Sequence, residues 1–342
     1  MLIPNNAIFL FLQRFTGTFL KRMKNCFYSK RTSIRWQAYV LMLAIVLSVW
    51  QNVEAQRSEF GVLAGTMFYL GDLNQTKLFN FNLKDPSLNQ VHFSGGFMYR
   101  YNLSPRLALK ADFLFGKVSA SDAGTVMANR NLSFSSPVTE FSAELELNFF
   151  ELYNTTGKNR FAPYIFAGLT VFSFDPTATY NNKEYHLQSL GTEGQGLSSD
   201  GLSFDNSDPN NDAVETKKQY SLTSMAIPFG FGIKVTCGRM FTFGAEWGMR
   251  WTFTDYLDDV SGCYYDNDLL RKRRGDLTAD LADRSPELQD NNGNNLSKHI
   301  AGHQRGNNTT HDAYSFAGIT MTVRFGNSDR ACYLKPAKRS RR

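Results

Sequence analysis

Hydrophobic and polar positions alternate residue by residue over 241–256, which reads FTFGAEWGMRWTFTDY. One row of side chains is apolar and aromatic and includes Trp247 and Trp251. The other row is small, polar or charged and includes Glu246 and Arg250. Successive side chains of a β-strand point to opposite faces, so the pattern predicts a strand with one apolar and one polar face. The apolar row is expected to face either a protein core or lipid, and this stretch alone does not decide which.

The same alternation, or the chemistry of a strand end, recurs along the chain. Strands are predicted over 58–70, 90–103, 107–119, 132–150, 161–174, 219–236, 241–256 and 312–325. Two of these stretches deviate from the pattern. Leu63 and Met67 interrupt the polar row of the first, and both rows of 161–174 are apolar or small.

Every second connection between these strands is short, with tight turns predicted at 104–106, 151–160 and 237–240. The other connections are longer and polar, above all the loops 175–218 and 257–311. Strands joined in this way alternate in direction, so the turns collect at one end and the long loops at the other. This sorting is typical of outer-membrane barrels, whose turns face the periplasm. A soluble sandwich gives no reason for it.

The predicted fold class is therefore all-β: an eight-stranded antiparallel transmembrane β-barrel over 56–326, with short periplasmic turns and long extracellular loops. Aromatic residues make up 14 % of the chain, which suits amphipathic strands and argues against a helical membrane protein. An interior bounded by eight strands is just wide enough for side chains to fill, so no open pore is expected.

The first 55 residues are predicted to be a leader. Arg35 precedes an apolar run over 38–50, and Ala55 follows as a small residue. These features indicate a secretory signal peptide cleaved after Ala55, with an uncleaved anchor as the alternative. No Cys follows the run at which a lipoprotein could be lipidated. A basic periplasmic tail is predicted over 327–342, and the mature protein is expected in the bacterial outer membrane, in contact with its lipids.

The formal net charge of +6 comes from the leader. The chain has 37 Lys and Arg and 31 Asp and Glu, of which residues 1–55 hold seven and one, so 37 − 7 and 31 − 1 leave 30 of each sign. A nearly neutral mature chain gives no reason to expect a nucleic-acid partner. The sequence also suggests no cofactor and no small-molecule substrate.

Charged residues on the polar rows are predicted to lie inside the barrel. They are Arg100, Lys110, Asp112, Glu140, Glu144, Glu146, Lys234, Glu246, Arg250 and Arg324. Because unpaired buried charges are costly, these residues should pair across strands. Glu246 and Arg250 are about 13 Å apart along one strand, so each should find its partner elsewhere. A structural salt-bridge plug is the favoured interpretation, and a proton or ion path is the alternative.

Candidate chemistry outside the barrel wall is weaker. His299 and His303 have the spacing of a helical metal site but lie in an Asn-rich loop, which favours a solvated loop. Asp255, Asp258 and Asp259 could bind calcium, although a turn at the barrel rim is the simpler interpretation.

The basic run at 271–274 could contact anionic lipid head groups or simply be solvated. No Ser/His pair is placed for catalysis, so the protein is not expected to be an enzyme. Cys237 and Cys332 both follow predicted strand ends on the periplasmic side, which makes them a candidate disulfide. No metal-binding cysteine pattern is present.

Several stretches go beyond a generic barrel. They are Tyr69–Asn74, Thr192–Gly196, Phe253–Gly262, Gln304–Asn307 and Asp312–Tyr314. Together they resemble the PorG-type outer-membrane barrels of Gram-negative bacteria with type IX secretion, a family long carried as a domain of unknown function. The resemblance covers roughly 58–326 and is most specific in the motif loop, with Thr254, Asp255, Tyr256, Asp258 and Asp259.

The resemblance implies a non-enzymatic component of the type IX secretion apparatus. Such a protein is anchored in the outer membrane and contacts a periplasmic ring, here through the periplasmic turns. The basic tail departs from the family pattern. Two other functions stay open: a surface adhesion or recognition barrel acting through loops 175–218 and 257–311, and a lipid-modifying barrel enzyme.

Overall fold

The computed structural model describes residues 58–73, 92–150, 152, 160–197, 218–238, 240–290 and 292–324. All of them belong to one compact unit, Ala55–Arg342. The predicted leader 1–55 and tail 327–342 lie outside the described residues and stay predictions.

Strands account for most of the described structure. They are β1 (Ser58–Leu70), β2 (His92–Asn102), β3 (Leu107–Ser121), β4 (Ser133–Asn148), β5 (Phe161–Phe174), β6 (Thr177–Tyr180), β7 (Lys183–His186), β8 (Thr223–Cys237), β9 (Phe241–Thr252) and β10 (Ala313–Arg324). The helical elements are the 3-10 turns η2 (Ala128–Arg130) and η3 (Ser285–Glu287) and the helices α3 (Leu187–Leu190), α4 (Asn267–Arg274) and α5 (Asp276–Ala282).

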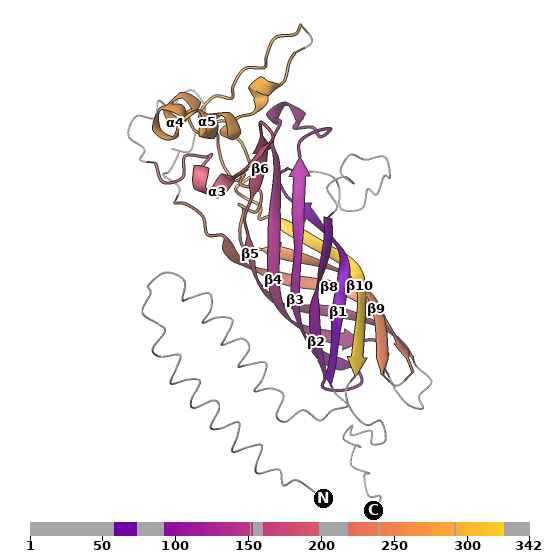
Figure 1. Cartoon of the computed structure of the whole chain (residues 1–342). Helices are drawn as coiled ribbons and strands as arrows, with labels where there is room; N and C mark the ends of the chain where they lie inside the picture. The colour runs from indigo at the N-terminus through magenta and orange to yellow at the C-terminus, as the bar shows by residue number, and fades with distance from the viewer. Residues whose placement is uncertain are drawn as a thin grey trace, which may run out of the picture. The chain divides into compact units, whose positions relative to one another are not determined.

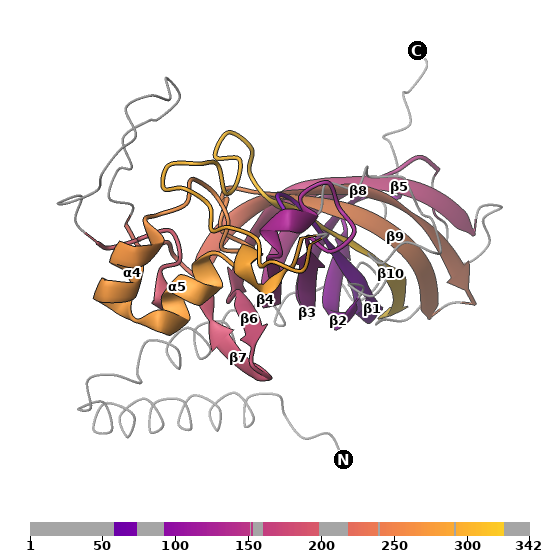
Figure 2. The ribbon, with the colours of Figure 1, turned by 90° about the horizontal axis from the view of Figure 1, so that it is seen from above.

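The strands form one antiparallel sheet in the order β3-β2-β1-β10-β9-β8-β5-β4-β6-β7. The sheet closes because β3 also pairs with β4, from Leu107 opposite Leu147 to Ser121 opposite Ser133. Leaving out the small hairpin β6–β7, eight strands enclose the interior, and seen from above β5 and β8 lie across from β1 and β2 (Figure 2). The predicted eight-stranded antiparallel barrel is confirmed.

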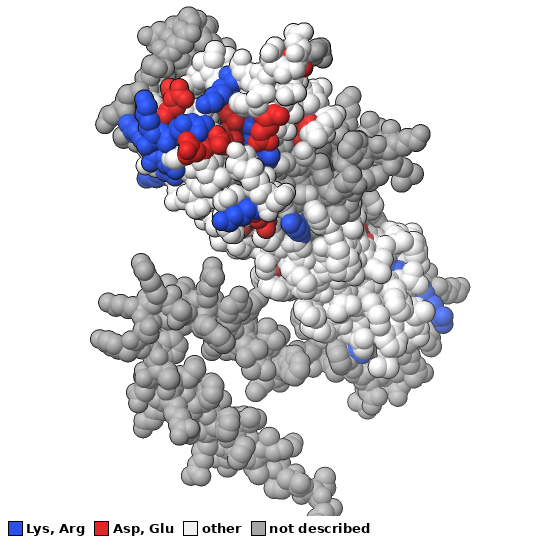
Figure 3. Space-filling view, turned by 45° about the horizontal axis from the view of Figure 1, so that its top comes forward, with Lys and Arg blue, Asp and Glu red and all other residues white. Residues whose placement is uncertain are grey.

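The outer face of the barrel is a band of exposed apolar side chains. Phe93 on β2 is 75 % exposed, and Ile319 on β10 is 66 % exposed. The barrel wall on the face in Figure 3 carries few charged side chains, whereas the loop end carries many. A band of this kind on a closed barrel, with charges at one end, fits a wall surrounded by lipid.

The inner face of β5 explains its weak alternation. Tyr164 and Phe166 point inward, where their rings lie 4.3 Å and 4.5 Å from the ammonium groups of Lys234 and Lys110. Phe166 packs across Gly248, where a Cβ atom would lie only 2.6 Å from the ring. Both rows of β5 are apolar because one faces outward and the other supports buried cations.

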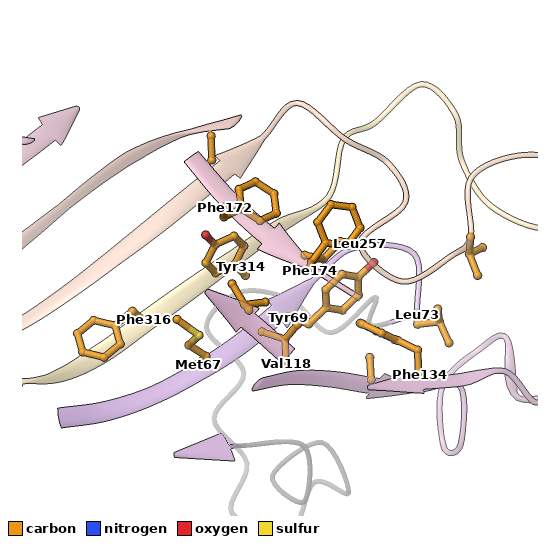
Figure 4. Packing of buried hydrophobic residues seen from close by; sticks show 14 of the residues in the cluster. Met67, Tyr69, Leu73, Val118, Phe134, Phe172, Phe174, Leu257, Tyr314 and Phe316 are labelled. Carbon is orange, nitrogen blue, oxygen red and sulfur yellow. The ribbon is translucent and has the colours of Figure 1, made fainter. Parts of the chain in front are cut away.

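An apolar cluster occupies the loop-end half of the interior. Leu63 and Met67, which interrupt the polar row of β1, are buried within it. Figure 4 shows Met67 with Phe316 and Tyr314 of β10, and Tyr69 near Phe134 of β4. The interior thus changes from charged at the turn end to apolar at the loop end, and the two residues that broke the pattern mark the change.

The loop end is folded rather than open. The loop predicted at 175–218 contains β6, β7 and α3, and the loop at 257–311 contains α4, α5 and η3, all gathered at one end of the barrel (Figure 1). Asp266 begins α4, because its carboxylate accepts hydrogen bonds from the backbone N–H groups of Asp268 and Leu269. No helix of the described chain is long and apolar enough to cross a membrane.

Several strands are shorter than predicted. β8 begins at Thr223 and not at 219, and β9 ends at Thr252 and not at Tyr256. The Thr252 hydroxyl donates to the backbone oxygen of Asp312 at 2.7 Å, and Leu257 N–H donates to the Asp312 carboxylate at 3.0 Å. These side-chain hydrogen bonds accompany the last backbone bond between the two segments, from Asp312 N–H to the Thr254 oxygen at 3.1 Å, beyond which the chain leaves the barrel wall and turns over its end.

Candidate functional site: a charged interior and a folded cap

A chain of ion pairs crosses the turn-end half of the interior. Arg324 and Arg100 both contact Glu59, at 2.7 Å and 3.0 Å. Arg100 also binds Glu146 with two guanidinium nitrogens, at 2.9 Å and 3.0 Å. Lys234 contacts the same Glu146 at 2.6 Å. Bidentate arginine–carboxylate pairs of this kind fix geometry as well as charge, so these residues tie β1, β2, β4, β8 and β10 together.

Lys110 is the hub of a second group. Its ammonium lies 3.1 Å from Asp112, 2.9 Å from Glu144 and 3.0 Å from Glu246. Tyr164 also donates to Glu246, at 2.7 Å. Among these three carboxylates, the ammonium donates hydrogen bonds to Glu246 alone, at 3.0 Å and 3.2 Å, while Asp112 and Glu144 are held by its charge. One cation among three carboxylates leaves an excess of negative charge in this part of the interior.

A third group lies at the border with the apolar cluster. Arg250 donates to Glu140 from two nitrogens, at 3.2 Å and 2.9 Å, and Tyr314 donates to the other Glu140 oxygen at 2.5 Å. Glu246 and Arg250, neighbours on one face of β9, thus have different partners, on β3 and β4.

All ten residues predicted for the interior are buried, and the structure adds an eleventh, Glu59. The acids are Glu59, Asp112, Glu140, Glu144, Glu146 and Glu246, and the bases are Arg100, Lys110, Lys234, Arg250 and Arg324. The position of Glu59 on the polar row of its strand was the signal that could have identified it. Leu63 and Met67 follow Glu59 along β1 toward the loop end and are buried in the apolar cluster, which favours a plug over a proton or ion path.

The loop end carries a second polar cluster, here called the cap and formed by 71–73, 122–132, 187–197 and 253–312. Most stretches that carry the family resemblance meet in it or at its border with the barrel wall. Glu193 is its central acceptor: its carboxylate accepts from the backbone N–H groups of Ser261 and Gly262, at 2.9 Å and 3.1 Å. Arg305 donates to the same carboxylate at 3.1 Å and to the Asp259 backbone oxygen at 2.6 Å.

Asp259 links the motif loop to two other loops. Thr192 donates to its carboxylate at 2.5 Å and Tyr220 donates at 2.6 Å. Burial raises the pKa of Asp259 to about 6, although Arg305 opposes the shift. The Tyr220 ring stacks on Tyr256 with centroids 4.5 Å apart. Asp259 and Tyr256, both predicted site residues, therefore act in the cap as anchors of its loops.

Asp72 anchors the last of these loops. Its carboxylate accepts from Asn307 N–H at 2.6 Å. Gly306 allows this approach, because a Cβ atom there would lie 2.6 Å from the Asp72 carboxylate and 2.8 Å from the Ser261 nitrogen. Arg130 donates to the Asp72 backbone oxygen at 2.9 Å while its guanidinium binds Asp122. Contacts between loops so far apart in sequence cannot be predicted from the spacing of residues along the chain.

Within the motif loop, the predicted residues also make local hydrogen bonds. Thr254 accepts from Tyr256 N–H at 3.2 Å, and Asp258 accepts from Val260 N–H at 2.9 Å. Asp255 is half-buried near Asp312. No group of His, Cys, Asp or Glu in the described ranges is arranged to hold a metal ion. The calcium hypothesis is therefore not supported, and the loop is built as a hydrogen-bonded turn at the rim.

His299 meets Asp283 and Ser285, but not as a catalytic triad. Both partners lie on the Nδ1 side of the ring, at 3.1 Å and 3.4 Å, and Ser285 donates to Asp283 at 2.6 Å. A triad needs the nucleophile at the nitrogen opposite the carboxylate. The ring stacks on Tyr264 at 4.3 Å, and His303 lies exposed nearby. The cluster stabilises the loop and lacks the arrangement for acyl transfer.

The basic run on α4 is partly committed to internal contacts. Arg271 pairs with Asp276 and Asp280 at 2.6 Å each, and Arg274 donates to the backbone oxygens of Leu190 and Gln195 at 2.6 Å and 2.5 Å. Lipid head-group binding by this run stays a prediction.

Cys237 is exposed at the end of β8. Its candidate partner Cys332 lies outside the described residues, so the disulfide also stays a prediction.

A closed ladder, an apolar outer band and an ion-paired interior define a small transmembrane β-barrel, closed by side chains and covered by a folded cap. The chain belongs to the family described as "Domain of unknown function (DUF6089)", which matches residues 38–193 and 179–281. No curated protein matches the chain.

Solved structures similar to the chain are barrels of low sequence identity. The N-terminal β-barrel domain of Pseudomonas aeruginosa OprF is 11 % identical with a TM-score of 0.30, covering 79 % of this chain and 98 % of its own. Neisserial surface protein A is 7 % identical with a TM-score of 0.35, covering 78 % and 97 %. Ail, the attachment invasion locus protein of Yersinia pestis, is 8 % identical with a TM-score of 0.32 in its complex with the heparin analogue sucrose octasulfate, covering 79 % and 99 %.

Proposed function

We propose that this protein is a non-enzymatic outer-membrane component of the type IX secretion apparatus, which anchors or contacts its periplasmic ring. The observation that carries the proposal is the convergence of the motif stretches at the cap. Five separate stretches supply two buried hydrogen-bonded groups, Tyr69 with Asp258 and Asp312, and Arg305 with Glu193. The motif loop joins the two groups, because Arg305 also donates to the Asp259 backbone oxygen. The resemblance to PorG-type barrels thus rests on one structural unit rather than on scattered matches.

The filled interior supports an anchoring role. Lys110 and Glu246 meet across the barrel, and an apolar cluster blocks the loop-end half, so the protein offers no passage for exported proteins. A filled barrel can hold an assembly in the membrane and offer its partners a binding surface. Exposed apolar side chains are present at the turn end, where Phe150 is 50 % and Met240 is 53 % exposed, and both are candidates for contact with a periplasmic partner.

Deletion of the gene, with export of secretion substrates as the readout, tests this function. Export should stop, and ring proteins should co-purify with the detergent-solubilised wild-type barrel. A double variant, Phe150→Ser with Met240→Ser, should assemble but recover less ring protein, whereas Lys272→Ser on the exposed face of α4 should recover as much as wild type. Normal export in the deletion strain would refute the proposal.

A second candidate is a surface-recognition barrel acting through its loops. The cap is folded and exposes isolated apolar side chains, with Val126 85 % and Ile300 58 % exposed. Loop substitutions at these two positions should then abolish binding to a surface partner while export continues. Lipid modification is the weakest of the three functions, since the Ser285–His299 geometry lacks a nucleophile at the required nitrogen.

A further inference from the structure

The phenol oxygen of Tyr69 lies between two carboxylates at the junction of the barrel and the cap. It is 2.6 Å from Asp258 and 2.5 Å from Asp312. All three side chains are buried. Tyr69 is near the end of β1, Asp312 immediately precedes β10, and Asp258 belongs to the motif loop. The three residues therefore join the barrel wall to the cap.

The number of hydrogens at this junction requires an additional proton. A phenol has one hydrogen to donate, and ionised carboxylates can only accept. Two contacts this short, on one phenol oxygen, need two hydrogens, so one of the two carboxyl groups is protonated and donates to Tyr69. The remaining carboxylate oxygens accept from backbone N–H groups: Asp258 from Val260 and Asp312 from Leu257, at 2.9 Å and 3.0 Å.

The surroundings of the pair favour this protonated state. Burial is the main cause that raises the pKa of Asp258 well above its ordinary value, and Asp72 adds to it. Burial, followed by the charge of Asp258, likewise raises the pKa of Asp312, to which Asp255 contributes.

Cations near the junction are already engaged by other acids. Arg130 faces Asp258, but its guanidinium is bound by Asp122 at 2.6 Å and 2.8 Å. Arg305, deeper in the cap, is bound by Glu193 at 3.1 Å and lies 3.9 Å from Asp259. A second negative charge on the carboxyl pair would therefore have no uncommitted cation beside it among the described residues.

We propose that the proton shared by Asp258, Tyr69 and Asp312 fastens the cap to the barrel wall, which makes the cap a lid that opens as the pH rises. The lid holds one more proton when closed than when open, because both carboxylates ionise once they reach water. Opening uncovers Leu257 and Val260, which are buried in the apolar cluster when the lid is closed. This inference does not depend on the secretion role.

The linkage has a definite magnitude. If opening releases one proton, the opening equilibrium constant rises about tenfold for each unit of pH. The range from pH 7 to 9 isolates this proton from Asp259, whose pKa of about 6 lies below the range.

Hydrogen exchange of the full-length protein in lipid nanodiscs measures this constant in the segment 253–262, after correction for intrinsic exchange rates. The wild type should show the tenfold dependence. Asp258→Asn and Asp312→Asn keep a hydrogen-bonding side chain but cannot release the proton, so their opening constants should not change with pH. Asp290→Asn, at a local hydrogen-bonded turn of the same loop, is the matched control and should behave as wild type.

A pH-independent wild type would overturn the proposal, as would an undiminished pH dependence in both variants. If neither variant assembles, infrared spectroscopy of the wild type provides the decision. The carbonyl band of a protonated carboxylic acid should fade between pH 7 and the pH at which the segment 253–262 loses its protection. Loss of protection without any change in that band would equally refute the shared proton.

Discussion

Lys110 of β3 and Glu246 of β9 meet at 3.0 Å, although their strands stand on opposite sides of the barrel. In the closed order of eight strands, four steps separate β3 from β9 in either direction. A single ion pair therefore spans the full width of the interior. Tyr314 of β10 and Glu140 of β4 repeat the relationship at 2.5 Å, so the barrel is braced across its diameter at two levels.

Replacing Lys110 should destabilise the barrel strongly. Lys110→Met leaves Asp112, Glu144 and Glu246 buried without their shared cation. Loss of one partner of a buried pair typically costs about 3–5 kcal/mol, and that loss is expected in the free energy of unfolding. Urea unfolding in phospholipid vesicles, followed by tryptophan fluorescence, measures it. Lys272→Met on the exposed side of α4 is the control, and equal midpoints for the two variants would contradict the prediction.

Removing one of the three acids around Lys110 should not lower the free energy of unfolding. Asp112→Asn leaves two carboxylates for one ammonium, which relieves the like-charge repulsion around Lys110. Replacing a buried charge that is in excess is expected to be neutral or stabilising, so the unfolding midpoint should stay or rise. A fall as large as that of Lys110→Met would show that the carboxylates are not in excess.

The lipid-facing row should tolerate charge only near its ends. Trp247 lies midway along β9, where its ring packs on Phe231 at 5.5 Å, and Trp251 lies near the loop end. An arginine in the middle of the membrane costs about 2–4 kcal/mol, against about 0–1 kcal/mol near the interface. Trp247→Arg should therefore unfold at a much lower urea concentration than Trp251→Arg. Equal, small effects would mean that this face is not in lipid.

The strands, and which of their side chains point into the barrel, could be predicted because a closed barrel imposes a period of two on almost every strand. The deviations were informative as well. Leu63 and Met67 looked like errors in the pattern but face an interior that turns apolar toward the loop end. Glu59 was absent from the predicted network although it shares its row with Gly61 and Gly65. Its partners Arg100 and Arg324 come from neighbouring strands, whose register no single stretch reveals.

The cap could not be predicted in the same way. Its stretches were recognised as motifs, but neither spacing nor alternation indicates which loops meet above a barrel. The contact of Glu193 with Ser261 joins loops 68 residues apart, and that of Asp72 with Asn307 joins loops 235 residues apart. Helix α4 was not predicted within the polar loop 257–311. A short polar helix that is stabilised by an N-terminal capping side chain and by ion pairs has no long apolar stripe to identify it.

Loss of Glu193 should release the cap and leave the barrel folded. In Glu193→Ala, two buried backbone N–H groups and Arg305 lose their acceptor, at about 1–3 kcal/mol for each unsatisfied group. Proteolysis within 253–312 should become fast, while the heat-modifiable gel mobility of the barrel stays unchanged. Glu287→Ala, at an exposed ion pair with Arg284, is the matched control. Unfolding of the barrel and cap together would contradict their separation.

Asp259 should make the stability of the folded cap depend on pH in the acidic range. Its pKa is raised by burial to about 6, whereas an unfolded aspartate has a value of about 3.9. Between these values the folded cap binds a proton that the unfolded loop has lost, so the stabilisation is complete below about pH 4 and declines as the pH rises to about 6. The two pKa values correspond to about 3 kcal/mol over that range.

Asp259→Asn removes this proton while keeping the hydrogen-bonding shape and a side chain suited to the left-handed backbone at φ +66°. Corrected hydrogen exchange of 253–262 at pH 4 and pH 6 should show that wild type loses more protection than the variant. The proton of Asp258 and Asp312 contributes to both proteins and cancels in this difference. A variant that loses as much protection as wild type would place the acid-range titration on another group, and a wild type that gains protection would reverse the sign argued from burial.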